Sequence, residues 1–101
     1  MAAPWRNVVP ATEDVIDITA NLQPATGIFL DAGDFEMFES ISSIKQVVQG
    51  TNYVIKVRIS PEDTGYIHMK TYVALPINNQ GPVITGIQQN KTLNDPIESF
   101  N

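Results

Sequence analysis

Two neighbouring segments with alternating apolar and polar residues limit the fold more than any other feature of this sequence. In residues 51–60, apolar side chains at alternate positions face one way, while Lys56 and Arg58 face the other way. Residues 66–75 repeat the pattern, and residues 61–65 between them are rich in turn-forming residues. A period of two is typical of a β-strand with one buried face. The two segments therefore predict an antiparallel hairpin.

A helix is predicted before these strands, because apolar residues recur at spacings of three and four over residues 12–32. Pro24 lies inside this stretch and either kinks the helix or ends it. We favour a kink, because the apolar stripe continues in phase beyond the proline. Further strands are expected over residues 35–45, with a bulge, and over residues 83–92. Together the elements predict an α+β fold, with one α-helix packed across a four- to five-stranded antiparallel β-sheet.

The length and the charge restrict the organisation and the partners. With 101 residues, the chain is expected to form a single domain, 1–101, in which residues 1–11 are an extended N-terminal arm. Eleven acidic against six basic residues give a net charge of −5, which argues against nucleic acid as a partner. Anionic membrane surfaces are equally unfavourable partners, and no apolar run approaches the ~18 residues of a membrane span.

Residue types that carry chemistry are scarce. The absence of cysteine excludes disulfides and thiolate sites, and the start of the chain does not resemble a secretory signal, so we expect a cytoplasmic protein. His68 is the one histidine, and a single histidine within a strand is usually structural. The acidic pair Glu62 and Asp63 lacks further ligands nearby, so neither a metal site nor a cofactor is expected. An enzyme is therefore the weakest of the alternatives.

Apolar residues from three distant segments are expected at one end of the sheet. The lengths of the predicted strands bring the turn around residues 46–50, the loop that begins at Leu75 and the arm to the same edge. Val47 and Val48 occupy the predicted turn, although they are equally compatible with the end of a longer strand. An exposed apolar cluster of this kind often marks an interaction site.

Residues 46–50, QVVQG, resemble the Q-x-V-x-G hairpin of the cystatins, which are protein inhibitors of papain-like cysteine proteases. The resemblance extends to residues 51–57 (TNYVIKV), to HMK at 68–70 before ALP at 74–76, and to VITG at 83–86. It covers about residues 10 to 95 in the family's order. Within the family, the chain resembles the stefin branch in two respects: it lacks cysteine, and it carries Leu75 and Pro76 in the second loop.

The resemblance implies a reversible, competitive inhibitor of cathepsin-type proteases that blocks the active-site cleft with a wedge. The implied protease-binding residues belong to the arm and to two loops: Ala2, Ala3, Pro4, Gln46, Val47, Val48, Gln49, Gly50, Leu75 and Pro76. The alternative is a cystatin-fold binding module with a non-protease partner. The family implies a monomer that is able to form a domain-swapped dimer. One departure is the arm, which lacks the glycine that stefins carry there.

Overall fold

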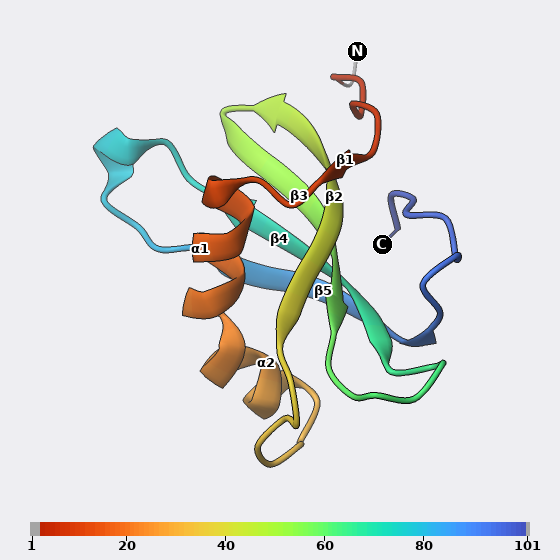
Figure 1. Cartoon of the computed structure of the whole chain (residues 1–101). Helices are drawn as coiled ribbons and strands as arrows, with labels where there is room; N and C mark the ends of the chain where they lie inside the picture. Colours follow the sequence, from red (N-terminus) through yellow and green to blue (C-terminus); the bar gives the residue numbers. More distant parts are fainter. Residues whose placement is uncertain (1–2, 101) are drawn as a thin grey trace.

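The structure is a computed structural model that describes residues 3–100, and Figure 1 shows the path of the chain. The chain forms a five-stranded antiparallel sheet, and two helices lie between its first and second strands. In chain order the elements are β1 (Val9–Pro10), α1 (Glu13–Asn21), α2 (Gln23–Phe29), β2 (Glu39–Val48), β3 (Gly50–Arg58), β4 (Tyr66–Val73), the short 3₁₀ helix η1 (Pro76–Asn78) and β5 (Val83–Lys91). No helix within residues 3–100 is both long enough and apolar enough to cross a membrane.

The sheet follows the chain without a crossover, in the order β1-β2-β3-β4-β5, and every neighbouring pair is antiparallel. The α+β prediction is therefore confirmed, with five strands. The predicted bulge is present in β2, where the register shifts between Ser40 and Ser42. The strand itself begins later than residue 35, because Phe35 and Phe38 pack their rings together in the loop before it, with centroids 5.3 Å apart.

The helical region covers most of the predicted range, but it forms two helices instead of one kinked helix. Thr12 caps α1 by accepting a hydrogen bond from the backbone N–H of Val15. The helix stops at Leu22, and α2 starts again with Pro24 in its first turn. A proline has no N–H to donate and obstructs the preceding turn, whereas in a first turn that N–H is not needed. The break therefore occurs just before the proline.

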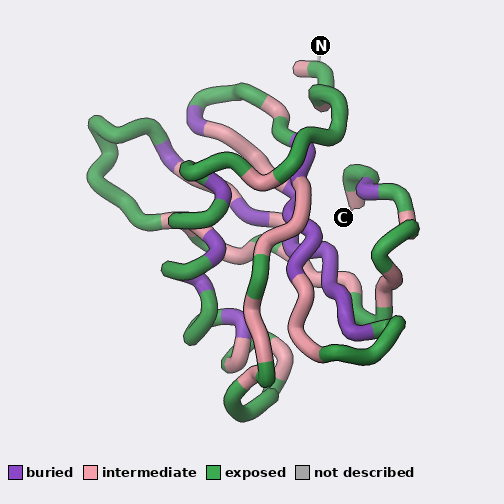
Figure 2. Tube along the Cα trace, viewed as in Figure 1, coloured by how far each residue is buried: buried purple, intermediate pink, exposed green. Residues whose placement is uncertain are grey.

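The two helices lie against one face of the sheet (Figures 1 and 2). Six fully buried apolar residues form the core between them: Val15, Leu22, Ile55, Val57, Ile67 and Met69. Thr19 and Thr26 are also buried there, and each hydroxyl donates to the backbone carbonyl four residues earlier, at 2.7 Å. The alternation of residues 51–60 and 66–75 thus correctly predicted which side chains face the helices.

The opposite face of the sheet is covered by the C-terminal segment, residues 92–100, which we call the tail. Ile97 and Phe100 of the tail pack against Ile44 and Val54 of β2 and β3. Two lysines of the sheet hold the tail by its backbone. Lys56 Nζ donates to the carbonyls of Leu93 (2.5 Å) and Asp95 (2.7 Å), and Lys70 Nζ donates to that of Phe100 (2.8 Å).

Candidate functional site

The first hairpin turns through a single residue, Gln49. Val48 pairs with Gly50, and Val47 pairs with Thr51, so both valines are ladder residues at the end of β2. The interpretation as turn residues is wrong, and the longer strand is correct. The reason is Gly50, whose φ of 99° lets the chain reverse sharply, a conformation that glycine adopts without a steric penalty.

Both valines nevertheless remain accessible at the end of the hairpin. Val47 is 45% exposed and Val48 is 43% exposed, although strand valines usually pack on one face of a sheet. The hairpin extends beyond the helices and the tail (Figure 1). The two side chains point to opposite sides of the ladder, since successive strand residues alternate. The tip is therefore apolar on both sides.

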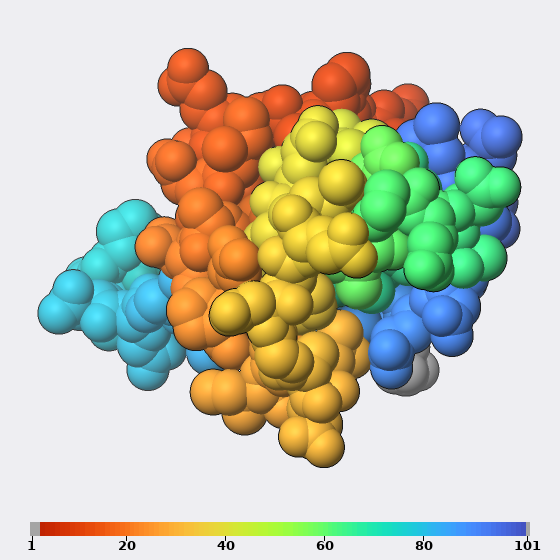
Figure 3. All heavy atoms as spheres, turned by 60° about the horizontal axis from the view of Figure 1, so that its bottom comes forward, coloured from red at the N-terminus to blue at the C-terminus, as the bar shows by residue number. Residues whose placement is uncertain are grey.

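The loop after β4 leaves from the same end of the sheet. Thr51 at the start of β3 pairs with Val73 at the end of β4. Leu75, 43% exposed, and Pro76 follow immediately. This loop forms a ridge that projects from the body of the molecule (Figure 3). We call residues 46–52 and 73–77, taken together, the hairpin end.

One apolar residue of this ridge was not among the predicted site residues. Ile77, in η1, is 87% exposed, the highest value among the large apolar side chains that the structure describes. The available signal was its position directly after Leu75 and Pro76 in a loop otherwise rich in Asn, Gln and Gly. A large apolar side chain in a polar loop is a common mark of a contact residue.

The described part of the arm runs beside the first hairpin. The Gln46 amide donates through Nε2 to the Ala3 carbonyl at 2.7 Å, and the backbone N–H of Arg6 donates to the Lys45 carbonyl at 2.8 Å. Pro4 is exposed between these contacts. Ala2, also predicted as a site residue, lies outside the described residues.

Hydrogen bonds hold the first hairpin of the hairpin end in place. The Tyr72 hydroxyl donates to the Gln49 carbonyl, which links the end of β4 to the tip of the first hairpin. Asn52 Nδ2 donates to Gln46 Oε1 at 3.0 Å. Both polar atoms of the Gln46 amide are thus bonded within the chain, whereas the Gln49 side chain is exposed. The hairpin end is therefore a structured surface.

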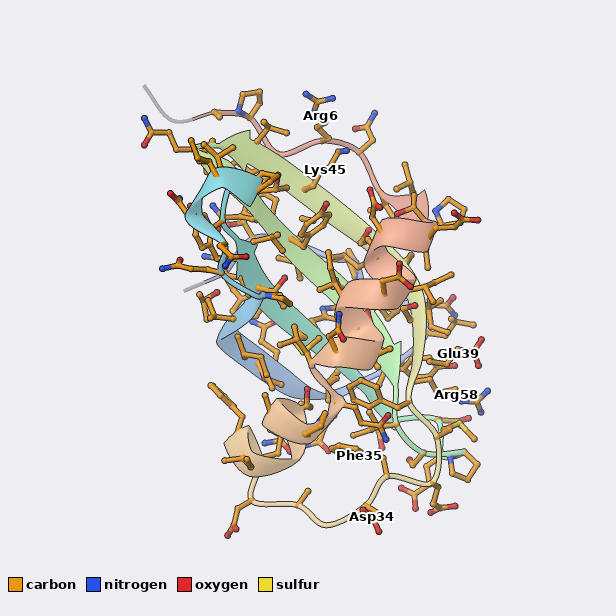
Figure 4. The ribbon with its side chains drawn as sticks, turned by 90° about the vertical axis from the view of Figure 1, so that its left-hand side faces the viewer. Arg6, Asp34, Phe35, Glu39, Lys45 and Arg58 are labelled. Atoms are coloured by element: carbon orange, nitrogen blue, oxygen red, sulfur yellow. The ribbon has the colours of Figure 1, made fainter. Side chains whose placement is uncertain are left out.

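The hairpin end carries no charged side chain. Residues 46–52 and 73–83 contain no charged residue. Arg6 and Lys45 lie near this end, and Asp34 lies at the opposite end, where α2 leads into the following loop (Figure 4). Removing an uncharged apolar surface from water carries no ionic desolvation cost. The hairpin end is thus well suited to burial in a partner.

His68 is not available for chemistry. It lies in β4 beneath the tail, its side chain is 1% exposed, and Nε2 has no hydrogen-bond partner. Burial, followed by the neighbouring positive charges of Lys56 and Lys91, lowers the pKa of His68 from 6.5 to about 4. Near neutral pH the imidazole is therefore neutral and enclosed. Within residues 3–100, no group of three or more His, Asp or Glu side chains could hold a metal ion.

Comparison with known proteins places this geometry in a family. A family model described as the cystatin domain matches residues 30–94, which is more than half of the chain. The chain belongs to the cystatin family. Cystatin-A of Felis catus is 33% identical over 91 residues, which cover 90% of each chain. Cystatin-A of Homo sapiens is 34% identical over 94 residues and again covers 90% of each chain.

A fish relative agrees with the mammalian ones. Cystatin-B of Oplegnathus fasciatus is 33% identical over 91 residues, covering 89% of this cystatin and 87% of the relative. Cystatin-A and cystatin-B are stefins, so the resemblance to the stefin branch is confirmed. At family level the role of this cystatin is that of a cysteine protease inhibitor, and it is not an enzyme.

Proposed function

We propose that this cystatin inhibits papain-like cysteine proteases of the cathepsin type by filling the active-site cleft with a wedge. The wedge consists of the arm and the hairpin end. The observation that carries the proposal is the convergence of these segments, which are far apart in the sequence, along one border of the molecule, where the hairpin end itself carries no charge. Nothing observed favours the alternative of a non-protease partner.

The residues of the wedge come from the arm and from the two loops of the hairpin end. We assign to it the ten residues that the resemblance implies, Ala2, Ala3, Pro4, Gln46, Val47, Val48, Gln49, Gly50, Leu75 and Pro76, and we add Ile77. For Ala2 the assignment rests on the resemblance alone. Val47, Val48 and Leu75 supply apolar area, and each Å² removed from water contributes about 25 cal/mol.

The hairpin end is suited to tight binding because little of it needs to be ordered on docking. The Tyr72–Gln49 and Asn52–Gln46 hydrogen bonds hold the first hairpin before a partner arrives, and the backbone N–H of Asn78 donates to the Leu75 carbonyl within the second loop. A surface that is already in its bound shape loses less conformational entropy on association. No group of the wedge needs to react with the catalytic cysteine, so the inhibition is reversible and competes with substrate.

Titration of papain or a cathepsin with the purified protein tests this function. We expect the rate of substrate hydrolysis to fall with increasing inhibitor, and the inhibition to be overcome by more substrate. Full proteolysis that persists at micromolar inhibitor would exclude the proposal. The same assay against a chymotrypsin-like serine protease is the control for nonspecific effects, and there we expect no inhibition.

Val48→Asp tests the position of the wedge. Because Val48 is exposed, the substitution should leave the fold intact, but it forces a carboxylate into the protease cleft. We expect the inhibition constant to rise by about tenfold or more, since 1.4 kcal/mol corresponds to a factor of ten. The control is Lys91→Ala, because Lys91 pairs with Tyr66 at the other end of the sheet. Equal effects of the two substitutions would mean that the wedge is misplaced.

We further propose that the chain acts in the cytoplasm as a single-domain monomer. A chain without cysteine needs no oxidising compartment to fold. The sharp turn at the first hairpin is the place where two copies would exchange strands to form a domain-swapped dimer. Size-exclusion chromatography before and after heating tests this exchange. We expect a dimer peak after heating, and a monomer peak alone would contradict the exchange.

A further inference from the structure

Ahead of β1, which itself pairs with β2, residues 3–6 of the arm are attached to the sheet at three successive points. Gln46 holds the carbonyl of Ala3, the ring of Trp5 packs against the cluster of Ile44, Val54 and Ile97, and Lys45 accepts the N–H of Arg6. Figure 4 shows the arm running along β2, with Arg6 beside Lys45. Attachment on both sides of Pro4 leaves this stretch little freedom to swing.

Among residues 3–100, Gln46 is the one side chain that holds the arm backbone by a hydrogen bond. Its amide is oriented by Asn52, which lies directly opposite on β3 and donates to Oε1. With Oε1 occupied in this way, Nε2 is turned toward the Ala3 carbonyl. Both polar atoms of the Gln46 amide are thus engaged within the chain, one N–H on the arm and one lone pair on Asn52, which fixes the orientation of the side chain.

We propose that Gln46 is a positioning residue that sets the course of the arm, with Asn52 orienting Gln46 and Trp5 as the second anchor. No glycine precedes Gly27, so the arm has no residue that adopts bent conformations freely. Its direction is instead held by contacts with the sheet. The inference rests on the proposed function insofar as the positioned arm is part of the wedge.

Gln46→Glu is the sharpest test of this role. Glutamate has the same length and still accepts from Asn52, but it cannot donate to the Ala3 carbonyl. We expect the inhibition constant to rise about three- to tenfold, the range of one lost hydrogen bond. Asn52→Ala, which leaves the Gln46 amide without its orienting partner, should have a smaller effect in the same direction.

A double-mutant cycle with Trp5→Ala separates positioning from direct contact with the protease. If Gln46 acts through the arm, its substitution loses most of its effect once Trp5→Ala has already loosened the arm, and falls below about twofold. The control is Gln49→Ala, whose effect should be of equal size in both backgrounds, because the Gln49 side chain is exposed and not bonded to the arm. An undiminished effect of Gln46→Glu in the Trp5→Ala background would overturn the proposal.

A measurement without any protease keeps this inference separate from the proposed function. Trp5 is the only tryptophan, so its fluorescence reports on the arm directly. We expect Gln46→Glu, but not Gln49→Ala, to shift the emission to longer wavelength and to increase quenching by acrylamide. Unchanged Trp5 emission in Gln46→Glu would overturn the positioning role even if the protein inhibits. If the wild type does not inhibit but the Trp5 emission shifts in Gln46→Glu, the proposed function is wrong and the positioning role of Gln46 is still supported.

Discussion

Replacing Gly50 by alanine is expected to reduce inhibition about ten- to hundredfold and to lower the free energy of unfolding, since a side chain forced to a positive φ costs on the order of 1–3 kcal/mol. A Cβ on Gly50 would lie 2.5 Å from the Val73 carbonyl oxygen and 2.6 Å from the Tyr72 hydroxyl. The hairpin would have to shift away from β4 to make room. Both loops of the hairpin end would then lose their relative position.

The measurement combines the inhibition constant for papain with chemical unfolding followed by circular dichroism. Gly33→Ala is the matched control, because an added Cβ there meets nothing within 4 Å, its φ is not positive, and Gly33 lies beyond α2 at the other end of the molecule. We expect that control to bind protease as the wild type does. Inhibition by Gly50→Ala equal to that of Gly33→Ala would show that the geometry of the turn is irrelevant to binding.

The second large effect is expected in acid, and it originates at His68. The pKa of His68 is lowered to about 4 in the folded chain, by burial and then by Lys56 and Lys91, whereas the unfolded value is near 6.5. The groups that face it are Lys56 of β3, Lys91 of β5 and Asp95 of the tail, and only Asp95 favours its charged form.

The sign of the change in stability follows from whether the folded or the unfolded state binds the proton. Above pH 6.5 neither state holds it, so His68 makes no difference to stability there. As the pH falls from 6.5 toward 4, His68 binds a proton in the unfolded chain but not in the folded chain. The free energy of unfolding therefore decreases. We expect a total loss of about 3 kcal/mol, at no more than about 1.4 kcal/mol per pH unit. Below pH 4 both states bind the proton and the loss stops growing.

Urea unfolding at a series of pH values between 3.5 and 8, in wild type and in His68→Gln, measures this contribution. The difference between the two curves isolates His68 from the carboxylates, which titrate in both proteins. His68→Leu serves as a second variant in case glutamine is poorly tolerated in the buried site. If the variants lose stability in acid as steeply as the wild type does, His68 is not the group responsible.

The face of the sheet that packs on the helices could be predicted because it obeys simple periodicity. Ile55 and Val57 alternate with polar residues, and Val15 and Leu22 lie on one helical stripe, so burial and sequence pattern agree. The same reasoning offers a break at Pro24 as one of two possibilities. The stripe stayed in phase across it because α2 resumes almost at once, and this continuity favoured a kink over two helices.

The burial of the other face of the sheet could not be predicted, because the side chains on that face are largely polar. Lys56 and His68 are buried there by contact with the tail, and Lys56 bonds backbone carbonyls, which every residue carries. Such contacts leave no pattern in the sequence. The same holds for the grip of Gln46 on Ala3: the hairpin residues were identified by resemblance, but the acceptor is a carbonyl without a sequence signature.

Trp5 near the start of the chain and Ile97 near its end pack into one cluster, so the two extremities share an anchor. Loss of the Ile97 and Phe100 side chains would therefore also loosen the indole of Trp5. Affinity handles or dyes attached within the tail carry the same hazard. The exposed Glu62 and Asp63, in the turn at the other end of the sheet, offer a safer attachment point.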